Sequence, residues 1–164
     1  KKSETDWALA KNKETRANYV TSIFLEHDDL EAVNLRLQKK YAEICGKEQR
    51  CETYMCDGAE ILLVSYGITS RIARNAVDKM RKSGIKAGLL RPQALFPFPT
   101  DELRKIAKNA KLLVSVELSN GQMIDDIRLA ISCAKPVELC ARMGGNLPSE
   151  DEITDKCLKF MREL

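Results

Sequence analysis

Four apolar runs recur at near-constant intervals between residues 59 and 145. They centre on Ile61–Tyr66, Ile85–Leu90, Leu112–Glu117 and Val137–Cys140, and their first residues are 24, 27 and 25 positions apart. Each interval is about the length of one strand, one crossover helix and two short loops. Near-continuous apolar runs are typical of strands that helices cover on both faces. The pattern therefore predicts an α/β fold with four parallel strands.

The segments between these runs have helical periodicity and residues that favour helix starts. The expected N-caps are Thr69 or Ser70, Thr100, Ser119 or Asn120, and Ser149. Gly84 is expected to end the first of these helices. Three prolines in the stretch RPQALFPFPT (91–100) exclude a helix directly after the second strand.

The chain before the first run has a different pattern. Residues 1–20 form a polar arm, with Trp7 as a possible anchor. An amphipathic helix follows, capped by Asp28 or Asp29 and ending near Gly46. Its apolar stripe consists of Leu30, Val33, Leu37, Tyr41 and Ile44. The stripe either packs on the parent domain or binds a partner subunit. We expect residues 1–50 to be the arm and connecting helix, and residues 51–164 to be the α/β domain, with Cys51–Met55 as an edge strand.

Composition and charge exclude several classes of protein. The 164 residues are 44% hydrophobic and 31% charged, an ordinary balance for one soluble domain. The net charge of +3 is too small to indicate nucleic acid as a partner. No run approaches the roughly 18 apolar residues of a membrane span. The polar start lacks the apolar core of a signal peptide and resembles a segment inside a longer protein.

The six cysteines are not spaced as metal ligands. No pair has the C-x-x-C spacing, and Cys45, Cys51 and Cys56 match neither a zinc site nor an iron–sulfur site. We expect Cys133, Cys140 and Cys157 to be small buried hydrophobic residues. The thiols are expected to be reduced, in a cytoplasmic protein without a metal site.

The loop after the first strand is a candidate anion site. Gly67, Thr69 and Ser70 lie at the expected helix start, where backbone N–H groups can hold an anion. The chain contains neither G-x-G-x-x-G nor the P-loop motif, and the second strand ends at Arg91-Pro92 instead of an acid that would bind a ribose. The alternative for Gly67 is a tight turn.

The loop after the third strand carries a carboxylate. Glu117 ends the apolar run, and Asn120, Gly121 and Gln122 follow in a polar turn. A buried carboxylate is either a general base or a structural group held by the N–H groups of the adjacent loop. No acid or histidine partner lies nearby in sequence, so the structural role is favoured.

The loop after the fourth strand contains an arginine and two glycines. Arg142 is suited to clamp a carboxylate, a phosphate or a partner acid, unless it is simply solvated. Gly144 and Gly145 permit a left-handed turn or a close backbone approach. His27, the single histidine, lies in a charged segment. No set of residues in the sequence completes a catalytic site.

Four motifs occur in a specific order. They are LLVSYGITSRIARNAVDKMRKSGIKAGLLRP, LFPFP, VSVELSNGQMIDDIRLA, and ARMGG followed by a Pro-Ser-Glu-Asp-Glu helix start. Together they resemble the C-terminal domain of the α subunit of 2-oxoacid:ferredoxin oxidoreductases. The stretch TSIFLEHDDLEAVNLRLQKKYAEI resembles the connecting helix in the 2-ketoisovalerate branch of that family. The resemblance covers about residues 19–164.

The resemblance implies a fold and a biochemical context. The fold is the transketolase C-terminal-domain type, a three-layer α/β/α sandwich with a mostly parallel five-stranded sheet and one antiparallel edge strand. The family decarboxylates 2-oxoacids oxidatively, passes electrons through iron–sulfur clusters to ferredoxin, and forms acyl-CoA. The whole enzyme would contain thiamine diphosphate, magnesium, iron–sulfur clusters and coenzyme A, and this fragment none of them.

The resemblance also implies partners. They are the N-terminal pyrimidine-binding half of the α subunit, the β, γ and ferredoxin-like subunits, and ferredoxin. We expect a non-catalytic assembly domain whose strand-end loops contact the rest of the enzyme. The alternatives are a stand-alone CoA- or nucleotide-binding module and the C-terminal domain of a transketolase-type enzyme. The identity of the 2-oxoacid is not encoded in these motifs.

Overall fold

The structure, a computed structural model, describes Ala8, Lys13, Thr15, Asn18 and residues 21–164. Trp7, the possible anchor, lies outside the described residues. The chain divides into two compact units, Lys1–Ala42 and Glu43–Leu164. The predicted domain boundary after residue 50 stays a prediction.

A five-stranded sheet forms the centre of the second unit. Its strands are β1 (Cys51–Tyr54), β2 (Ile61–Val64), β3 (Ala87–Pro92), β4 (Leu112–Glu117) and β5 (Val137–Ala141), in the order β1-β3-β2-β4-β5. β1 pairs antiparallel with β3, and all the other pairs are parallel. The predicted fold class, a mostly parallel sheet with one antiparallel edge strand, is confirmed.

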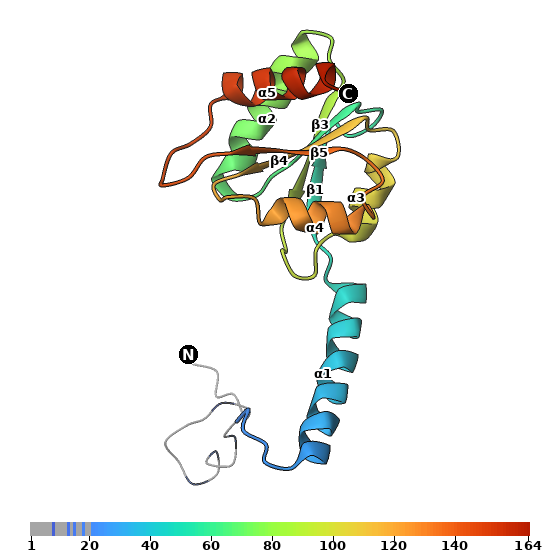
Figure 1. Cartoon of the computed structure of the whole chain (residues 1–164), viewed down its shortest axis with the longest axis vertical. Coiled ribbons are helices and arrows are strands. Elements are labelled where there is room, and N and C mark those ends of the chain that lie inside the picture. The colour runs from blue at the N-terminus through green and yellow to red at the C-terminus, as the bar shows by residue number, and fades with distance from the viewer. Residues whose placement is uncertain (1–7, 9–12, 14, 16–17, 19–20) are drawn as a thin grey trace. The chain divides into compact units, whose positions relative to one another are not determined.

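Four helices cover the two faces of this sheet. They are α2 (Gly67–Lys82), α3 (Thr100–Ala107), α4 (Met123–Ala130) and α5 (Glu150–Arg162). α2 and α5 lie side by side over one face, and α3 and α4 cover the other (Figure 1). The result is the expected three-layer arrangement.

The core is split between the two faces by the alternation of side chains along each strand. In β2, Ile61 and Leu63 pack with α2 and α5, while Leu62 and Val64 pack with α3 and α4. All four side chains are buried. A strand with both faces covered accounts for the continuous apolar run in the sequence.

Several element boundaries differ from the sequence predictions. β3 begins at Ala87 instead of Ile85 and continues to Pro92, because the antiparallel partner β1 pairs Cys51 with Pro92. Thr100 is the first residue of α3, and Pro99 precedes it as N-cap without a side-chain hydrogen bond. The prediction that Thr100 is the N-cap was therefore wrong by one residue. Ser149 does cap α5, accepting a hydrogen bond from the N–H of Glu152 at 3.1 Å.

Gly88 in β3 marks a close approach between two segments. A Cβ at this position would lie 2.8 Å from the carbonyl oxygen of Met55 and 2.9 Å from the Cα of Cys56. The loop after β1 can cross β3 only because residue 88 has no side chain.

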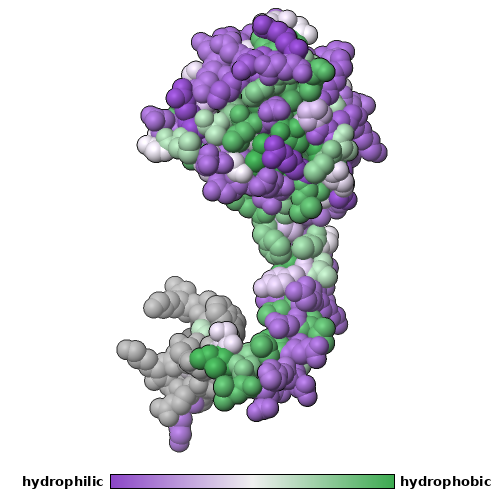
Figure 2. All heavy atoms as spheres, viewed as in Figure 1, coloured by the Kyte–Doolittle hydropathy of each residue, from purple (hydrophilic) through white to green (hydrophobic). Residues whose placement is uncertain are grey.

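The helix α1 (His27–Lys47) carries no buried residue. Its predicted stripe includes Leu30 and Tyr41, which are exposed, and Val33, Leu37 and Ile44, which are partly exposed. Figure 2 shows apolar and hydrophilic residues together on the visible surface of this helix. Both alternatives for the stripe, packing on the parent domain and contact with a partner subunit, stay predictions. Among the residues that the structure describes, no helix has the length and apolarity needed to cross a membrane.

Candidate functional site: the strand-end rim

The loops that follow β2, β4 and β5 lie at the carboxyl edge of the sheet. We call residues 65–70, 117–122 and 142–149 the strand-end rim. β3 and β4 lie on opposite sides of β2, so the chain reverses direction across the sheet between the ends of β2 and β4. This reversal is the topological switch point, where open α/β sheets usually bind ligands or partners.

The start of α2 does not have the predicted cap. The helix begins at Gly67, whose φ is +63°, and the N-cap residue Tyr66 makes no side-chain cap hydrogen bond. Thr69 donates its hydroxyl to the carbonyl oxygen of Tyr66 at 2.7 Å, and Ser70 donates to that of Gly67 at 2.7 Å. Both hydroxyls face backbone carbonyls within the first turn. Thr69 and Ser70 are therefore helical residues, and the prediction that one of them is the N-cap was wrong.

A buried serine links the β2 and β4 ends of the rim. The Oγ of Ser65 lies 2.9 Å from the carbonyl oxygen of Val116 and 2.9 Å from the Oγ1 of Thr69. Sequence reasoning did not single out Ser65. The available signal was a polar residue at the end of an otherwise apolar run.

Glu117 is the most strongly bonded side chain of the rim. It is only 1% exposed, and its two carboxylate oxygens accept four hydrogen bonds. Oε1 accepts from Ser115 Oγ at 2.6 Å and Ile124 N at 3.0 Å, whereas Oε2 accepts from Ser119 Oγ at 2.7 Å and Met123 N at 3.1 Å. The carboxylate thus binds the first N–H groups of α4, which a helix otherwise leaves without partners.

This geometry assigns Glu117 a structural role, as the sequence favoured. Its acceptor oxygens are occupied by donors of its own domain, and its carboxylate is closed to solvent. It also replaces the predicted local cap of α4. Ser119 and Asn120 do not open that helix, because α4 begins at Met123 with Gln122 as N-cap and Glu117 accepts the N–H groups instead.

The turn between β4 and α4 requires its glycine. Gly121 has a φ of +94°, and a Cβ there would lie 3.1 Å from the Cδ2 of Leu139 and 3.3 Å from the Cγ2 of Ile124. Asn120 and Gln122 are exposed on either side of it. These two side chains are available for contacts outside the domain.

Arg142 turns toward α5 and not toward the other candidate residues. Its Nε and Nη2 each lie 2.9 Å from the Oε2 of Glu152, in the first turn of α5. This hydrogen bond is the main reason that the pKa of Glu152 is lowered. Gly144 and Gly145 follow, both with positive φ, in a segment that extends beyond the end of the sheet (Figure 1). Arg142 is therefore neither simply solvated nor part of one anion site with Gly67.

Large apolar side chains are exposed in all three loops of the rim. They are Tyr66 and Ile68 after β2, Leu118 after β4, and Met143 and Leu147 after β5. Ile68 is 48% exposed and Met143 is 54% exposed. Sequence reasoning described these loops as polar and glycine-rich and missed this feature. Apolar side chains that gather on one surface, with polar groups between them, are typical of protein–protein contact sites.

The cysteines match the sequence predictions at Cys140 and Cys157 and differ at Cys133. All six cysteines are free, Cys140 and Cys157 are buried, and burial raises the pKa of both thiols. Cys133, predicted to be buried, is exposed, because α4 ends at Ala130 and Cys133 lies in a turn with positive φ. Within the described part of the chain, no group of three or more His, Cys, Asp or Glu side chains is suited to hold a metal ion.

Comparisons with known proteins identify the family. Residues 59–153 match the family model described as pyruvate:ferredoxin oxidoreductase core domain II. The chain belongs to this family. The matched range contains the whole sheet except β1, and it includes Gly67, Glu117 and Arg142.

Two curated relatives extend this result. The ketoisovalerate oxidoreductase subunit VorB of Methanothermobacter thermautotrophicus is 52% identical over 153 residues, which are 93% of this chain and 43% of VorB. The 2-oxoglutarate synthase subunit KorA of Methanothermobacter marburgensis is 35% identical over 102 residues, 62% of this chain and 27% of KorA. The chain is homologous to oxidoreductase subunits, and it spans less than half the length of the VorB proteins that it matches.

Solved structures share the fold. A 2-oxoglutarate:ferredoxin oxidoreductase from Magnetococcus marinus, solved with 2-oxoglutarate, coenzyme A and succinyl-CoA bound, matches with a TM-score of 0.71 and 20% identity. The match covers 83% of this chain and 24% of that one. A split-gene transketolase, described as an inactive beta4 tetramer, matches with a TM-score of 0.55 and 15% identity over 67% of this chain and 40% of that one. The transketolase-like fold is confirmed.

Proposed function

We propose that this domain is part of the α subunit of a 2-ketoisovalerate:ferredoxin oxidoreductase and that its strand-end rim holds the enzyme together. The exposed apolar side chains in all three rim loops are the observation that carries this proposal. The 52% identity to VorB supports the ketoisovalerate branch. The domain would contribute contacts, while decarboxylation on thiamine diphosphate, electron transfer to ferredoxin and acyl transfer to coenzyme A take place on other domains and subunits.

The chemistry of the rim supports a role in assembly more than one in catalysis. Its buried carboxylate, Glu117, is saturated by donors of its own domain, and its arginine, Arg142, is paired with Glu152. The rim leaves exposed apolar surface, the polar side chains of Asn120, Gln122 and Asn146, and the paired Arg142. We therefore expect the isolated chain to be colourless and inactive toward 2-oxoacids. An iron–sulfur absorption spectrum or decarboxylation by the purified chain would contradict this role.

The decisive experiment introduces two negatively charged side chains into the rim of the whole enzyme. Ile68→Asp combined with Met143→Asp should leave the melting temperature of the isolated chain nearly unchanged, because both side chains are about half exposed. In the co-expressed enzyme, the same double variant should fail to co-purify with the other subunits. Desolvating an unpaired carboxylate in an interface opposes association strongly.

The matched control is Leu129→Asp on α4. Leu129 is 76% exposed and lies on a helix that covers the sheet face, away from the rim loops. It should assemble normally. If the rim variant assembles as well as the control, the rim is not a contact surface.

Arg142 gives a finer test of the same surface. In the isolated chain Arg142→Ala removes a pair whose arginine side chain is 49% exposed, so we expect a loss of at most about 1 kcal/mol. In the assembled enzyme, a contact that buries this pair would raise the cost to about 2–5 kcal/mol. Wild-type assembly and activity in the Arg142→Ala enzyme would remove this residue from the proposal.

A further inference from the structure

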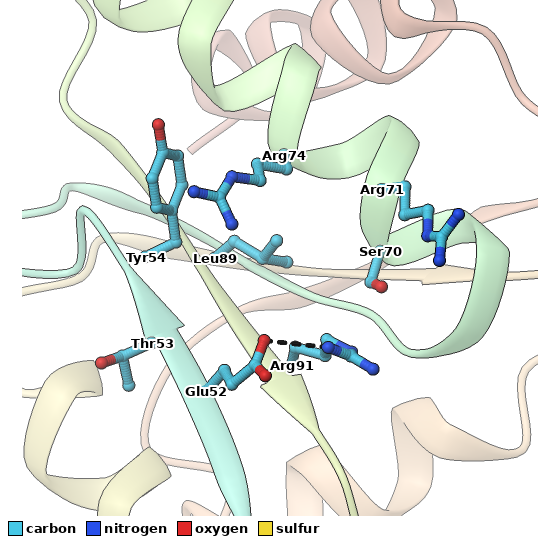
Figure 3. Close-up of a pocket in the computed structure, with 8 residues that line it drawn as sticks. All are labelled: Glu52, Thr53, Tyr54, Ser70, Arg71, Arg74, Leu89 and Arg91. Atoms are coloured by element: carbon cyan, nitrogen blue, oxygen red, sulfur yellow. Dashed lines mark hydrogen bonds and ion pairs between the residues drawn. The ribbon is translucent and has the colours of Figure 1, made fainter.

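A small basic pocket lies between α2, β1 and β3. Its volume is about 90 Å³, and its walls carry Arg71 and Arg74 from α2, Arg91 from β3 and Glu52 from β1 (Figure 3). Leu89 and Ser70, one of the predicted anion-binding residues, are also part of the lining. Pockets for whole cofactors are roughly 300–1,000 Å³. This pocket therefore has room for a single oxyanion group and not for a nucleotide.

The charges around the pocket are unbalanced. Three arginines line it, and Glu52 is the one carboxylate among the lining residues. Glu52 is bound to Arg91, with Nη1 to Oε2 at 2.9 Å, and its other oxygen accepts from Gln93 at 2.9 Å. The lining thus has a net charge of +2, from three arginines and one glutamate.

One donor of the pocket lacks an acceptor. The Nε of Arg91 is buried and has no hydrogen-bond partner among the described residues, although Nη1 of the same group is bound to Glu52. A buried donor without a partner is costly, and a native structure usually supplies an acceptor for it. A ligand oxygen in the pocket would supply that acceptor.

The two arginines of α2 both line the pocket. They are three residues apart, and Figure 3 shows their side chains extending in different directions. Arg74 lies over the ring of Tyr54, with its Cζ 4.0 Å from the ring centroid. The Tyr54 hydroxyl donates to Asp78 Oδ1 at 2.7 Å, so the ring that supports Arg74 is itself fixed. The guanidinium of Arg74 is therefore held in place before any ligand arrives.

We propose that this pocket binds a phosphate group, either free or as the phosphate monoester of a small ligand. A phosphate monoester carries about −1.5 to −2 charges at neutral pH, which matches the net charge of the lining. Its oxygens can accept from guanidinium groups on several sides, as Arg–phosphate pairs commonly do. A single carboxylate would leave part of the positive charge uncompensated.

The test uses the full chain and inorganic phosphate. Calorimetric titration gives the affinity, and amide chemical shifts in a ¹⁵N-labelled sample show where phosphate binds. We expect shifts at residues 70–74 and 89–91. Acetate and chloride at the same ionic strength should produce weaker effects at these amides. Arg71→Ala and Arg74→Ala should each weaken phosphate binding by about tenfold, since each removes charge-assisted hydrogen bonds.

Two further variants make the result specific. Glu52→Gln should tighten phosphate binding, because it removes the carboxylate that competes for Arg91; a variant that merely damaged the fold would not gain affinity. Arg162→Ala, which removes an exposed arginine in the last turn of α5, should leave affinity unchanged. Equal affinity in the Arg71→Ala, Arg74→Ala and parental chains would overturn the proposal. So would acetate shifting the same amides as strongly as phosphate.

Discussion

Replacing Glu117 with glutamine tests whether this carboxylate holds the β4–α4 connection. The side chain is buried and nearly isosteric with glutamine, so the change adds no bulk and opens no cavity. It removes one negative charge and converts one acceptor oxygen into a donor NH₂ group. The four donors around Glu117 then face only one remaining oxygen.

The size of the effect follows from those contacts. Whichever oxygen is replaced, one backbone N–H of α4 loses its acceptor: that of Met123 or that of Ile124. Such an orphaned buried donor costs about 1–3 kcal/mol. The two bonds to the remaining oxygen lose the charge that made them stronger, which costs roughly 1 kcal/mol each. Because a neutral amide is easier to bury than a carboxylate, part of this loss is recovered. We expect a net loss of about 2–4 kcal/mol.

Urea unfolding followed by circular dichroism measures this loss as a change in the free energy of unfolding. The m-value should stay constant if the variant keeps the native fold. The matched control is Glu138→Gln on the edge strand β5, which makes the same chemical change at an exposed position and should stay within about 0.5 kcal/mol of the parent. A Glu117→Gln variant as stable as this control would refute the structural role assigned to the carboxylate.

Three other predictions concern a glycine and two cysteines of the α/β domain. Gly88→Ala should destabilise the fold by about 1–3 kcal/mol or more in the same urea assay, because the new Cβ would meet the backbone of Met55 and Cys56. Burial raises the pKa of Cys157 to about 12, whereas an unfolded thiol ionises near pH 9. The unfolded chain therefore releases this proton first, and stability should fall between about pH 9 and pH 12, by at most about 1.4 kcal/mol per pH unit; Cys157→Ala should flatten this dependence. In the native chain iodoacetamide should modify the exposed Cys133 and spare Cys157, as mass spectrometry of digested peptides would show; modification of both at similar rates would contradict the structure.

The sequence by itself determined the class of fold. The central strands β2 and β4 are local runs of mostly apolar residues, so Ile61–Val64 and Leu112–Glu117 need only their own composition to be recognised. The Ser149 cap is local too, since the hydroxyl and the N–H that it binds are three residues apart. The sequence thus predicted the strand runs and this one cap, whereas the caps predicted for α2, α3 and α4 were wrong.

The tertiary structure decided the features that join distant residues. The arginine pocket combines Glu52 with Arg71 and Arg91, which lie in three separate elements. The end of β3 at Pro92 depended on its pairing with β1, and the exposure of Ile68 depended on what the sheet leaves uncovered. The periodicity of a sequence indicates which face of an element is apolar. The chemistry of a site depends on which side chains from different elements lie close together, and the packing of the tertiary structure determines this.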